Sequence, residues 1–209
     1  ALAVIFPEIN ALFGVPQPEK YHPEIDTGIH CLMALDQAAQ LSSCPKIRFA
    51  TLVHDLGKAL SPKENLPHHH GHELNGLPVL DNMLKRLRVP NDYGSIARQV
   101  MQYHTHSHKA FELKASTLVD MLSALGAFKA ASHLEKFLLA CHADAIGRKG
   151  LETHPYPQAE YIAQAALAAV DINSSSILNS GLEGEKIGAA IRELRIKAVN
   201  EFIKKTQLL

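Results

Sequence analysis

The segment His54-Asp55-Leu56-Gly57-Lys58 contains the groups of this chain that are best suited to chemistry. The imidazole of His54 and the carboxylate of Asp55 supply one nitrogen and one oxygen ligand, a pair that suits a divalent metal. We expect Gly57 to take the left-handed conformation that ends a helix, so the pair would lie on a last helical turn, where carbonyl ends favour a cation. Lys58 adds a point charge that could hold a phosphate beside the metal.

Other potential ligands are spaced on both sides of this pair, and this spacing makes a chance His-Asp dipeptide a poor explanation. They are His30 before the pair, and His72, His104 and Asp144 after it. Asp55 is the natural bridge if two metals bind, because a carboxylate has two oxygens. These ligand types do not select a metal, so we expect one or two divalent ions per chain, drawn from Ni, Co, Mn, Mg, Fe and Zn.

The elements that must position these residues are helical in almost every part of the chain, and no convincing alternation typical of strands occurs. Asp26 or Thr27 caps a helix that carries His30, and Pro45 starts the next helix. After a loop at 57–71 a helix runs through Leu87, and Pro78 either begins it or kinks it. We therefore predict an all-α fold, with further helices at 92–103, 116–125, 127–146, 157–170 and 185–205 and a polar break at 174–176 and 181–184.

The composition is that of an ordinary soluble globular protein, with 46% hydrophobic and 20% charged residues. No apolar run approaches the length of a membrane span, and no secretory signal opens the chain. The 21 basic and 21 acidic residues give a net charge of zero, which argues against a fold-wide electrostatic grip on nucleic acid. The 3 cysteines form no paired framework, so we expect reduced thiols and a cytoplasmic location.

The order of the potential ligands resembles the His…His-Asp…Asp signature of the HD-domain phosphohydrolases. His30, the pair His54-Asp55 and Asp144 match this signature, and His72 and His104 are similar to the two extra histidines of HD members that hold two metals. Further segments resemble the C-terminal HD portion of the bacterial multifunctional CCA-adding enzymes, which are tRNA nucleotidyltransferases, and this resemblance covers nearly all of the chain. These segments are 12–17, 22–28, 48–50 and 71–73.

This resemblance implies an HD-domain helical bundle at 23–170 and a C-terminal helical extension at 171–209. Because Ala1 opens the chain without a methionine, we expect residues 1–22 to connect to a nucleotide-adding head that is missing here. Such a head needs Gly-Ser followed closely by Asp-x-Asp, whereas Gly94-Ser95 is followed by Ile96-Ala97. We therefore expect that this chain does not add nucleotides.

The resemblance also suggests a role for each site residue. The ligands expected first are His30, His54, Asp55 and Asp144, and His72 and His104 would complete the shell of a second metal. Lys58 and Arg148 are the expected phosphate holders and form the expected catalytic set with Asp55. Because Arg148 follows Asp144 by four residues, the two would share a helix face, although a plain surface ion pair is the alternative.

The remaining histidines are not assigned to the catalytic set. His68, His69 and His70 lie in a Pro-flanked loop, and they either supply a general acid or are exposed and dispensable. His106 and His108, like Glu73, are polar groups available to support a metal ligand. Four more are interpreted as structural or surface residues: His22, His133, His142 and His154.

The residues alone favour a metal-dependent phosphohydrolase. The resemblance adds its substrates, which are 2′,3′-cyclic phosphodiesters and 2′-phosphates of nucleotides or tRNA 3′ ends, with a general phosphatase activity. Two alternatives stay open: another HD nucleotide hydrolase, and a tRNA-docking or dimerisation module with a secondary metal site. The docking alternative is based on residues 186–205, which contain six basic and two acidic side chains. A packed helix with a solvated face explains this charge excess equally well. Expected partners are the phosphate substrate, tRNA in the full-length protein and a second copy in a homodimer, but no membrane.

Overall fold

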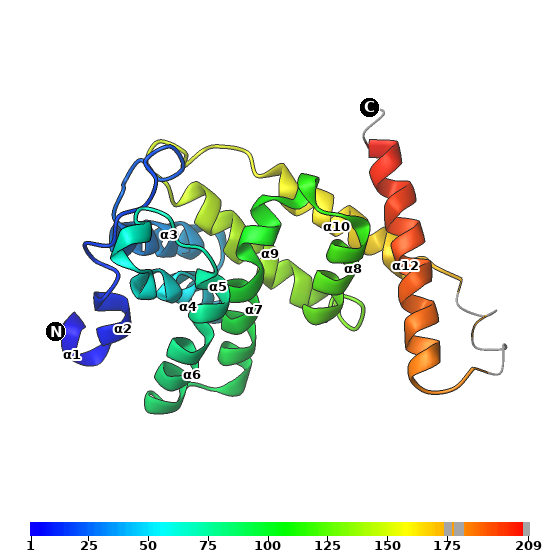
Figure 1. Cartoon of the computed structure of the whole chain (residues 1–209), viewed down its shortest axis with the longest axis horizontal. Helices are drawn as coiled ribbons and strands as arrows, with labels where there is room; N and C mark the ends of the chain where they lie inside the picture. Colours follow the sequence, from blue (N-terminus) through cyan, green and yellow to red (C-terminus); the bar gives the residue numbers. More distant parts are fainter. Residues whose placement is uncertain (174–176, 178–181, 207–209) are drawn as a thin grey trace. The chain divides into compact units, whose positions relative to one another are not determined.

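The computed structural model describes residues 1–173, 177 and 182–206, and within these the chain folds into helices joined by turns and loops (Figure 1). No strand forms in this part of the chain, where a single isolated bridge joins Pro16 and Asp26. The all-α prediction is confirmed. The polar break expected at 174–176 and at Gly181 lies outside the described residues.

Two compact units share the chain, and each is described by itself. The first comprises Ala1–His108 with Glu135–Tyr156, and the second comprises Lys109–Leu134 with Pro157–Leu209. This division by compactness differs from the domain boundaries expected at 1–22, 23–170 and 171–209, which stay predictions.

The helices of the first unit begin where the sequence supplies start signals. The Asp26 side chain accepts a hydrogen bond from the Ile29 amide (3.0 Å) and caps α3, while Pro45 opens α4. Pro78 lies in the first turn of α6, so it begins this helix and does not kink a longer one. The α-helices that lie wholly in this unit are α1 (Leu2–Ile5), α2 (Pro7–Asn10), α3 (Thr27–Leu41), α4 (Pro45–Val53), α5 (His72–Asn75), α6 (Leu77–Arg86) and α7 (Asn91–His108).

Small buried side chains let the central helices of this unit pack closely. α4 packs against both α3 and α7, and Ala34, Ala50 and Ala97 are fully buried. The short 3-10 helices η1 (Leu56–Leu60) and η2 (Lys63–Asn65) follow α4. The unit is completed by the part of α9 (Ala131–Ile146) that begins at Glu135.

Two helices differ from their expected bounds in ways that matter for the site. α7 continues to His108 and does not end at Tyr103. The prediction stopped too early because residues 104–108 lack an apolar period, yet they are helical. α9 begins at Ala131, four residues later than expected, after Gly126 turns the chain with a φ of +71°. The two short helices α1 and α2 were not expected.

The second unit contains η3 (Ala110–Glu112), α8 (Ala115–Ala124), α10 (Pro157–Val170) and α12 (Glu185–Thr206). α12 packs against α10 and α8, and the rings of Tyr161 and Phe202 lie 5.2 Å apart. On α12, Arg192 forms an ion pair with Asp120 (2.7 Å). Val199 is the buried residue of this helix, and the apolar side chains spaced along it are half-buried: Ile187, Ile191, Leu194, Ala198 and Phe202.

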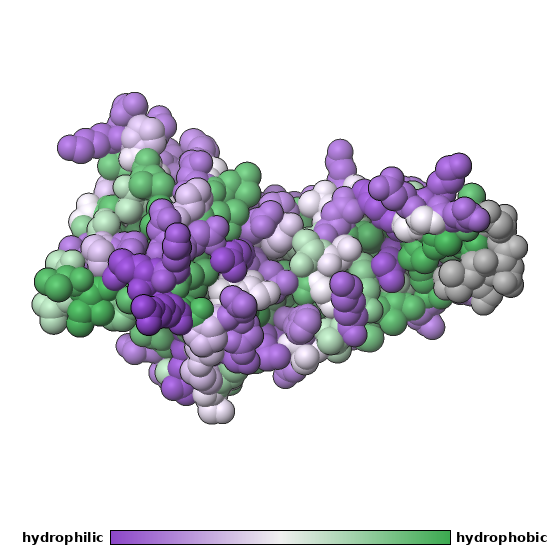
Figure 2. Space-filling view, turned by 90° about the horizontal axis from the view of Figure 1, so that it is seen from below, coloured by the Kyte–Doolittle hydropathy of each residue, from purple (hydrophilic) through white to green (hydrophobic). Residues whose placement is uncertain are grey.

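Surface hydropathy is mixed on the face seen in Figure 2. Hydrophobic side chains gather at its left edge, where α1 lies, and Val4 and Ile5 there are 83% and 51% exposed. Among the described residues, no helix combines the length and the apolar character that crossing a bilayer requires.

Candidate metal centre

The His54-Asp55 pair lies just beyond α4, where His54 caps the helix and Asp55 leads into η1. The expected left-handed conformation of Gly57 is wrong, because Gly57 belongs to η1 and is not among the positive-φ glycines. A Cβ at this position would overlap the His72 carbonyl oxygen and lie 2.8 Å from the Gly76 nitrogen. Glycine is therefore needed for the close approach of η1 and α5, which brings His72 to Asp55.

Three of the predicted ligands meet on one side of Asp55, although α3, α4 and α9 supply them from distant parts of the sequence. His30 Nε2 lies 3.0 Å from Asp144 Oδ1. His54 Nε2 lies 3.6 Å from the same oxygen and 3.2 Å from Asp55 Oδ2. All four side chains are buried. We call His30, His54 and Asp144 the first ligand group.

The other two predicted ligands meet on the opposite oxygen of Asp55. His72 Nε2 lies 3.3 Å from Asp55 Oδ1, and His104 Nε2 lies 3.6 Å from it. The two Nε2 atoms are 3.3 Å apart. We call His72 and His104 the second ligand group. Asp55 thus presents one oxygen to each group, the arrangement that a bridging carboxylate needs, while the role of each residue as a ligand stays a prediction.

The second ring nitrogen of three histidines is held by the backbone. The Nδ1–H of His54 donates to the Thr51 carbonyl (2.7 Å) and that of His72 to the His69 carbonyl (2.8 Å). The Nδ1–H of His104 donates to the carbonyl of Val100, one helical turn back (3.1 Å). Because a carbonyl only accepts, a neutral ring in each case keeps its lone pair on Nε2, the atom that faces the carboxylates.

These residues fit a divalent metal. Both carboxylate oxygens of Asp55 are buried and accept no hydrogen bond within the described residues, and buried charges of this kind are normally paired or bound to metal. Burial alone would lower the pKa of His54, but the negative charges of Asp55 and Asp144 raise it to about 10. The cluster therefore strongly favours a positive charge, and its nitrogen and carboxylate atoms are donors that first-row divalent metals accept.

Both predicted phosphate holders lie beside this cluster. Lys58 is 7% exposed, and its Nζ lies 2.7 Å from Asp55 Oδ2 and donates to Gln17 Oε1 (2.6 Å). Arg148 lies past the end of α9, yet its Nη2 is still 3.7 Å from Asp144 Oδ1. Its Nε is buried and makes no hydrogen bond to the described residues. Whether either residue holds phosphate stays a prediction.

Several residues outside the predicted ligand set support the cluster, and of these the sequence had offered His108 as an available partner. His108 Nε2 lies 2.6 Å from Asp144 Oδ2, and the hydroxyl of Tyr156 lies 3.1 Å from His108 Nδ1. The spacing of His104 and His108, four residues apart on α7, is a signal that could have placed both on this face. Gln17 and Glu24 come from the loop before α3 and lie in two of the segments that resemble the CCA-adding enzymes, but no ligand spacing indicates them.

Two of the unassigned histidines make specific contacts near the cluster. His22, interpreted as structural or surface, has a side chain only 12% exposed and bonded to Glu24 (3.0 Å). In the loop that follows η2, His69 is engaged by the Ser61 hydroxyl (2.7 Å) and the Pro16 carbonyl (2.9 Å). A structural role therefore suits His69 better than that of a general acid.

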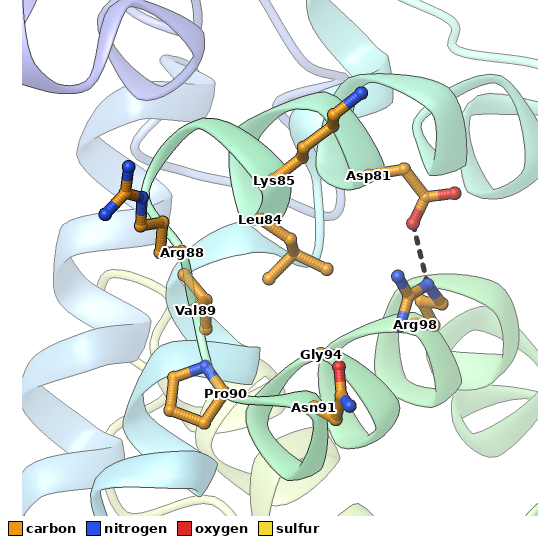
Figure 3. Close-up of a pocket in the computed structure, with 9 residues that line it drawn as sticks. All are labelled: Asp81, Leu84, Lys85, Arg88, Val89, Pro90, Asn91, Gly94 and Arg98. Atoms are coloured by element: carbon orange, nitrogen blue, oxygen red, sulfur yellow. Dashed lines mark hydrogen bonds and ion pairs between the residues drawn. The ribbon is translucent and has the colours of Figure 1, made fainter.

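A separate cavity of about 350 Å³ lies where α6 turns into α7 (Figure 3). Arg98 reaches across it to Asp81, with 2.7 Å between Nε and Oδ1. None of the predicted ligands or phosphate holders lines it.

The model of the HD domain family matches residues 27–166. The chain belongs to the HD domain family. Relatives of this HD domain include the multifunctional CCA protein of Methylococcus capsulatus, which is 54% identical over 203 residues, covering 97% of this chain and 48% of the relative. The proteins of the same name from Thioalkalivibrio sulfidiphilus and Shewanella denitrificans are 49% and 52% identical over 202 residues, each with 97% of this chain and 49% of the relative covered. The chain thus spans about half the length of these relatives. No solved structure matches it.

Proposed function

We propose that this HD domain is a metal-dependent phosphohydrolase that acts on 2′,3′-cyclic phosphodiesters and 2′-phosphates of nucleotides or tRNA 3′ ends. The observation that carries the proposal is Asp55, whose two buried oxygens accept no hydrogen bond in the described structure and face two separate groups of histidines. Lys58 pairs with one of these oxygens, but histidine nitrogens face both of them, and on His54, His72 and His104 the other ring nitrogen is already engaged. This arrangement suits the ligands of a divalent metal.

The residues divide the work between holding the ion and holding the substrate. His30, His54, Asp55 and Asp144 would bind one metal, and His72 and His104 would complete a second site through Asp55. A metal held there would neutralise phosphate charge and lower the pKa of a water, so that hydrolysis can proceed near neutral pH. Lys58 and Arg148 are the cations beside the cluster, and they would hold the phosphate oxygens.

The choice of substrate follows from charge and from the relatives. A 2′,3′-cyclic phosphate carries one negative charge and a strained ring, so its opening needs little help from a general acid. A triphosphate carries more charge and would need a denser cradle than Lys58 and Arg148 provide. The relatives are named multifunctional CCA proteins, and this name supports a tRNA 3′ end as the cellular substrate.

The test compares substrates on the 209-residue chain at equal concentration and with the same added metal. We expect 2′,3′-cyclic AMP to be cleaved at least about ten times faster than ATP or dGTP, a difference of about 1.4 kcal/mol in transition-state stabilisation. The assay is repeated with Mn²⁺, Co²⁺, Ni²⁺, Mg²⁺, Fe²⁺ and Zn²⁺, and the metal-free protein is the control. Equal or faster triphosphate turnover would assign the site to the other HD nucleotide chemistry.

A tRNA-docking or dimerisation module is the second candidate, and α12 is the feature that favours it. Lys186, Lys197 and Lys204 on this helix are exposed, whereas Arg192 is already paired with Asp120. If no substrate turns over with metal present, while tRNA binding is retained and weakened by salt, docking becomes the better proposal. Association into a homodimer is a separate prediction, for which sedimentation at several protein concentrations is the measurement.

A further inference from the structure

Glu24 lies in the loop before α3 and makes its contacts inside the first unit. Its side chain is 2% exposed, and Oε1 lies 3.0 Å from Nδ1 of His30 and 3.0 Å from Nδ1 of His22. The other carboxylate oxygen, Oε2, accepts a hydrogen bond from the Lys149 amide (3.3 Å). The Glu24 carboxyl group is therefore buried, and it faces two histidine rings through one oxygen and a backbone amide through the other.

His30 differs from the other histidines of the cluster in what faces its Nδ1. His54, His72 and His104 each donate to a backbone carbonyl three or four residues back. His30 is in the first turn of α3, where the Asp26 carbonyl accepts the backbone amide of His30 (3.0 Å). Its Nδ1 makes no hydrogen bond within the described residues, and the contact with Glu24 has ion-pair distance. A carboxylate only accepts, so Glu24 still favours the tautomer with the proton on Nδ1 and the lone pair on Nε2.

A strained turn holds Glu24 in this place. Ile25 has a φ of +62°, a conformation that a β-branched residue rarely adopts unless the surroundings impose it. The Ile25 carbonyl accepts the Gln17 amide (2.7 Å), and its own amide donates to the His22 carbonyl (2.8 Å). On the far side, the Asp26 carboxylate caps α3 and accepts the Gly14 amide (2.6 Å). The chain is fixed on both sides of Ile25, so Glu24 has little freedom to leave His30.

We propose that Glu24 is a positioning residue of the metal centre, which orients the His30 ring and fixes its tautomer from the strained turn at Ile25. The inference rests on the proposed function, because it assumes that His30 binds metal. Glu24 touches neither metal nor substrate in this proposal. It acts through His30 by raising the basicity of the ligand nitrogen and by reducing the freedom of the ring.

The experiment measures the affinity of the 209-residue chain for Mn²⁺ by competition with a fluorescent chelator. Glu24→Gln keeps the shape and one acceptor oxygen, and we expect about 10-fold weaker binding. Glu24→Ala removes the partner, and we expect about 100-fold weaker binding. The matched control is Glu73→Gln, since Glu73 lies 3.5 Å from Nδ1 of His72 but the His69 carbonyl already holds that ring. Its affinity should stay within about 2-fold of the parent protein.

Thermal unfolding of the metal-free proteins, in the presence of EDTA, separates positioning from a purely structural role. A fall in the Tm of Glu24→Gln with unchanged Mn²⁺ affinity would overturn the positioning role and leave the proposed function standing. Equal weakening by Glu73→Gln would also overturn it, because any loss of negative charge would then suffice. If the parent protein binds none of the six divalent metals of the activity assay, both proposals fail together.

Discussion

The first and second ligand groups both direct Nε2 atoms at Asp55, but they are held in different ways. In the second group, His72 and His104 donate Nδ1 to backbone carbonyls, and each supporting carbonyl lies within four residues of its histidine. In the first group, His30 relies on the carboxylate of Glu24, and Asp144 contacts His108 through its second oxygen (2.6 Å). His30 and Asp144 of the first group thus depend on side chains from other segments, whereas His54 and both members of the second group depend on local backbone.

This difference in support changes how each group responds to pH and to substitution. A backbone carbonyl cannot titrate and moves only with its helix, so support of this kind is insensitive to pH and to single substitutions. A carboxylate partner adds charge, which raises the basicity of the histidine that it contacts. Its effect is lost with one side chain. We therefore expect the first group to bind metal more tightly and to be the more easily damaged by mutations away from the ligands.

Asp55→Asn tests what the two groups share and should have the largest effect. The amide keeps the volume but removes the charge that faces both groups, so we expect metal to be lost from both and phosphohydrolysis to fall at least about 1,000-fold. Elemental analysis and turnover of 2′,3′-cyclic AMP are the measurements, with circular dichroism to verify the fold. Full activity of this variant at matched protein and metal would end the proposal that the cluster is catalytic.

His104→Ala and His54→Ala separate the groups from each other. We expect His104→Ala to lose one metal per chain while the first group keeps its own, with activity reduced about 10–100-fold. His54→Ala should remove the first metal and most of the activity, because His54 contacts both Asp55 and Asp144. Metal content by mass spectrometry of the desalted proteins gives the stoichiometry. The same loss in both variants would mean that the two groups form one site.

The sequence predicts the positions of helices best where a residue type sets a backbone limit. Asp26, Pro45 and Pro157 start α3, α4 and α10 at the expected places. The prediction fails where packing decides. Gly57 was expected to end a helix, but the neighbouring His72 carbonyl is what requires a glycine there. A close approach between segments leaves no periodic signal in the chain.

The site, like the helices, was predictable from the sequence only in part. The order of the predicted ligands anticipates their convergence, although His30 and Asp144 are 114 positions apart. The supporting residues could not be predicted in this way, since Gln17 meets Lys58 across 41 positions and Glu24 belongs to no motif of metal-binding spacing. Ligand types are constrained by the metal, whereas a supporting contact needs only an acceptor at the right place, and many residue types or a backbone carbonyl can provide one.

Lys58→Ala tests a residue that contacts the shared carboxylate without being a predicted ligand. It removes a phosphate-holding charge, so we expect KM for 2′,3′-cyclic AMP to rise about 10-fold with a smaller fall in kcat and unchanged metal content. Lys63→Ala is the matched control, because Lys63 is an exposed lysine in η2. An unchanged KM in Lys58→Ala would remove Lys58 from the phosphate site, and lost metal would make it a support of Asp55.

The effect expected to be smallest at neutral pH is that of His22→Asn, which tests whether the support of the first group is titratable. Burial lowers the pKa of His22 from 6.5 to about 4, against the opposing contact with Glu24. The unfolded chain therefore binds a proton on His22 at a higher pH than the folded chain does, so stability from this residue is present above pH 6.5 and is lost as the pH falls toward 4. The loss is at most about 3 kcal/mol for a shift of this size.

Urea unfolding with EDTA at pH 6.5, 5.5 and 4.5 should give a flatter decline of stability in His22→Asn than in the parent protein. His154→Asn, at an exposed position, is the control and should follow the parent curve. If His22→Asn follows it too, His22 does not resist protonation in the folded state, and the first group would be no more sensitive to pH through this contact than the second.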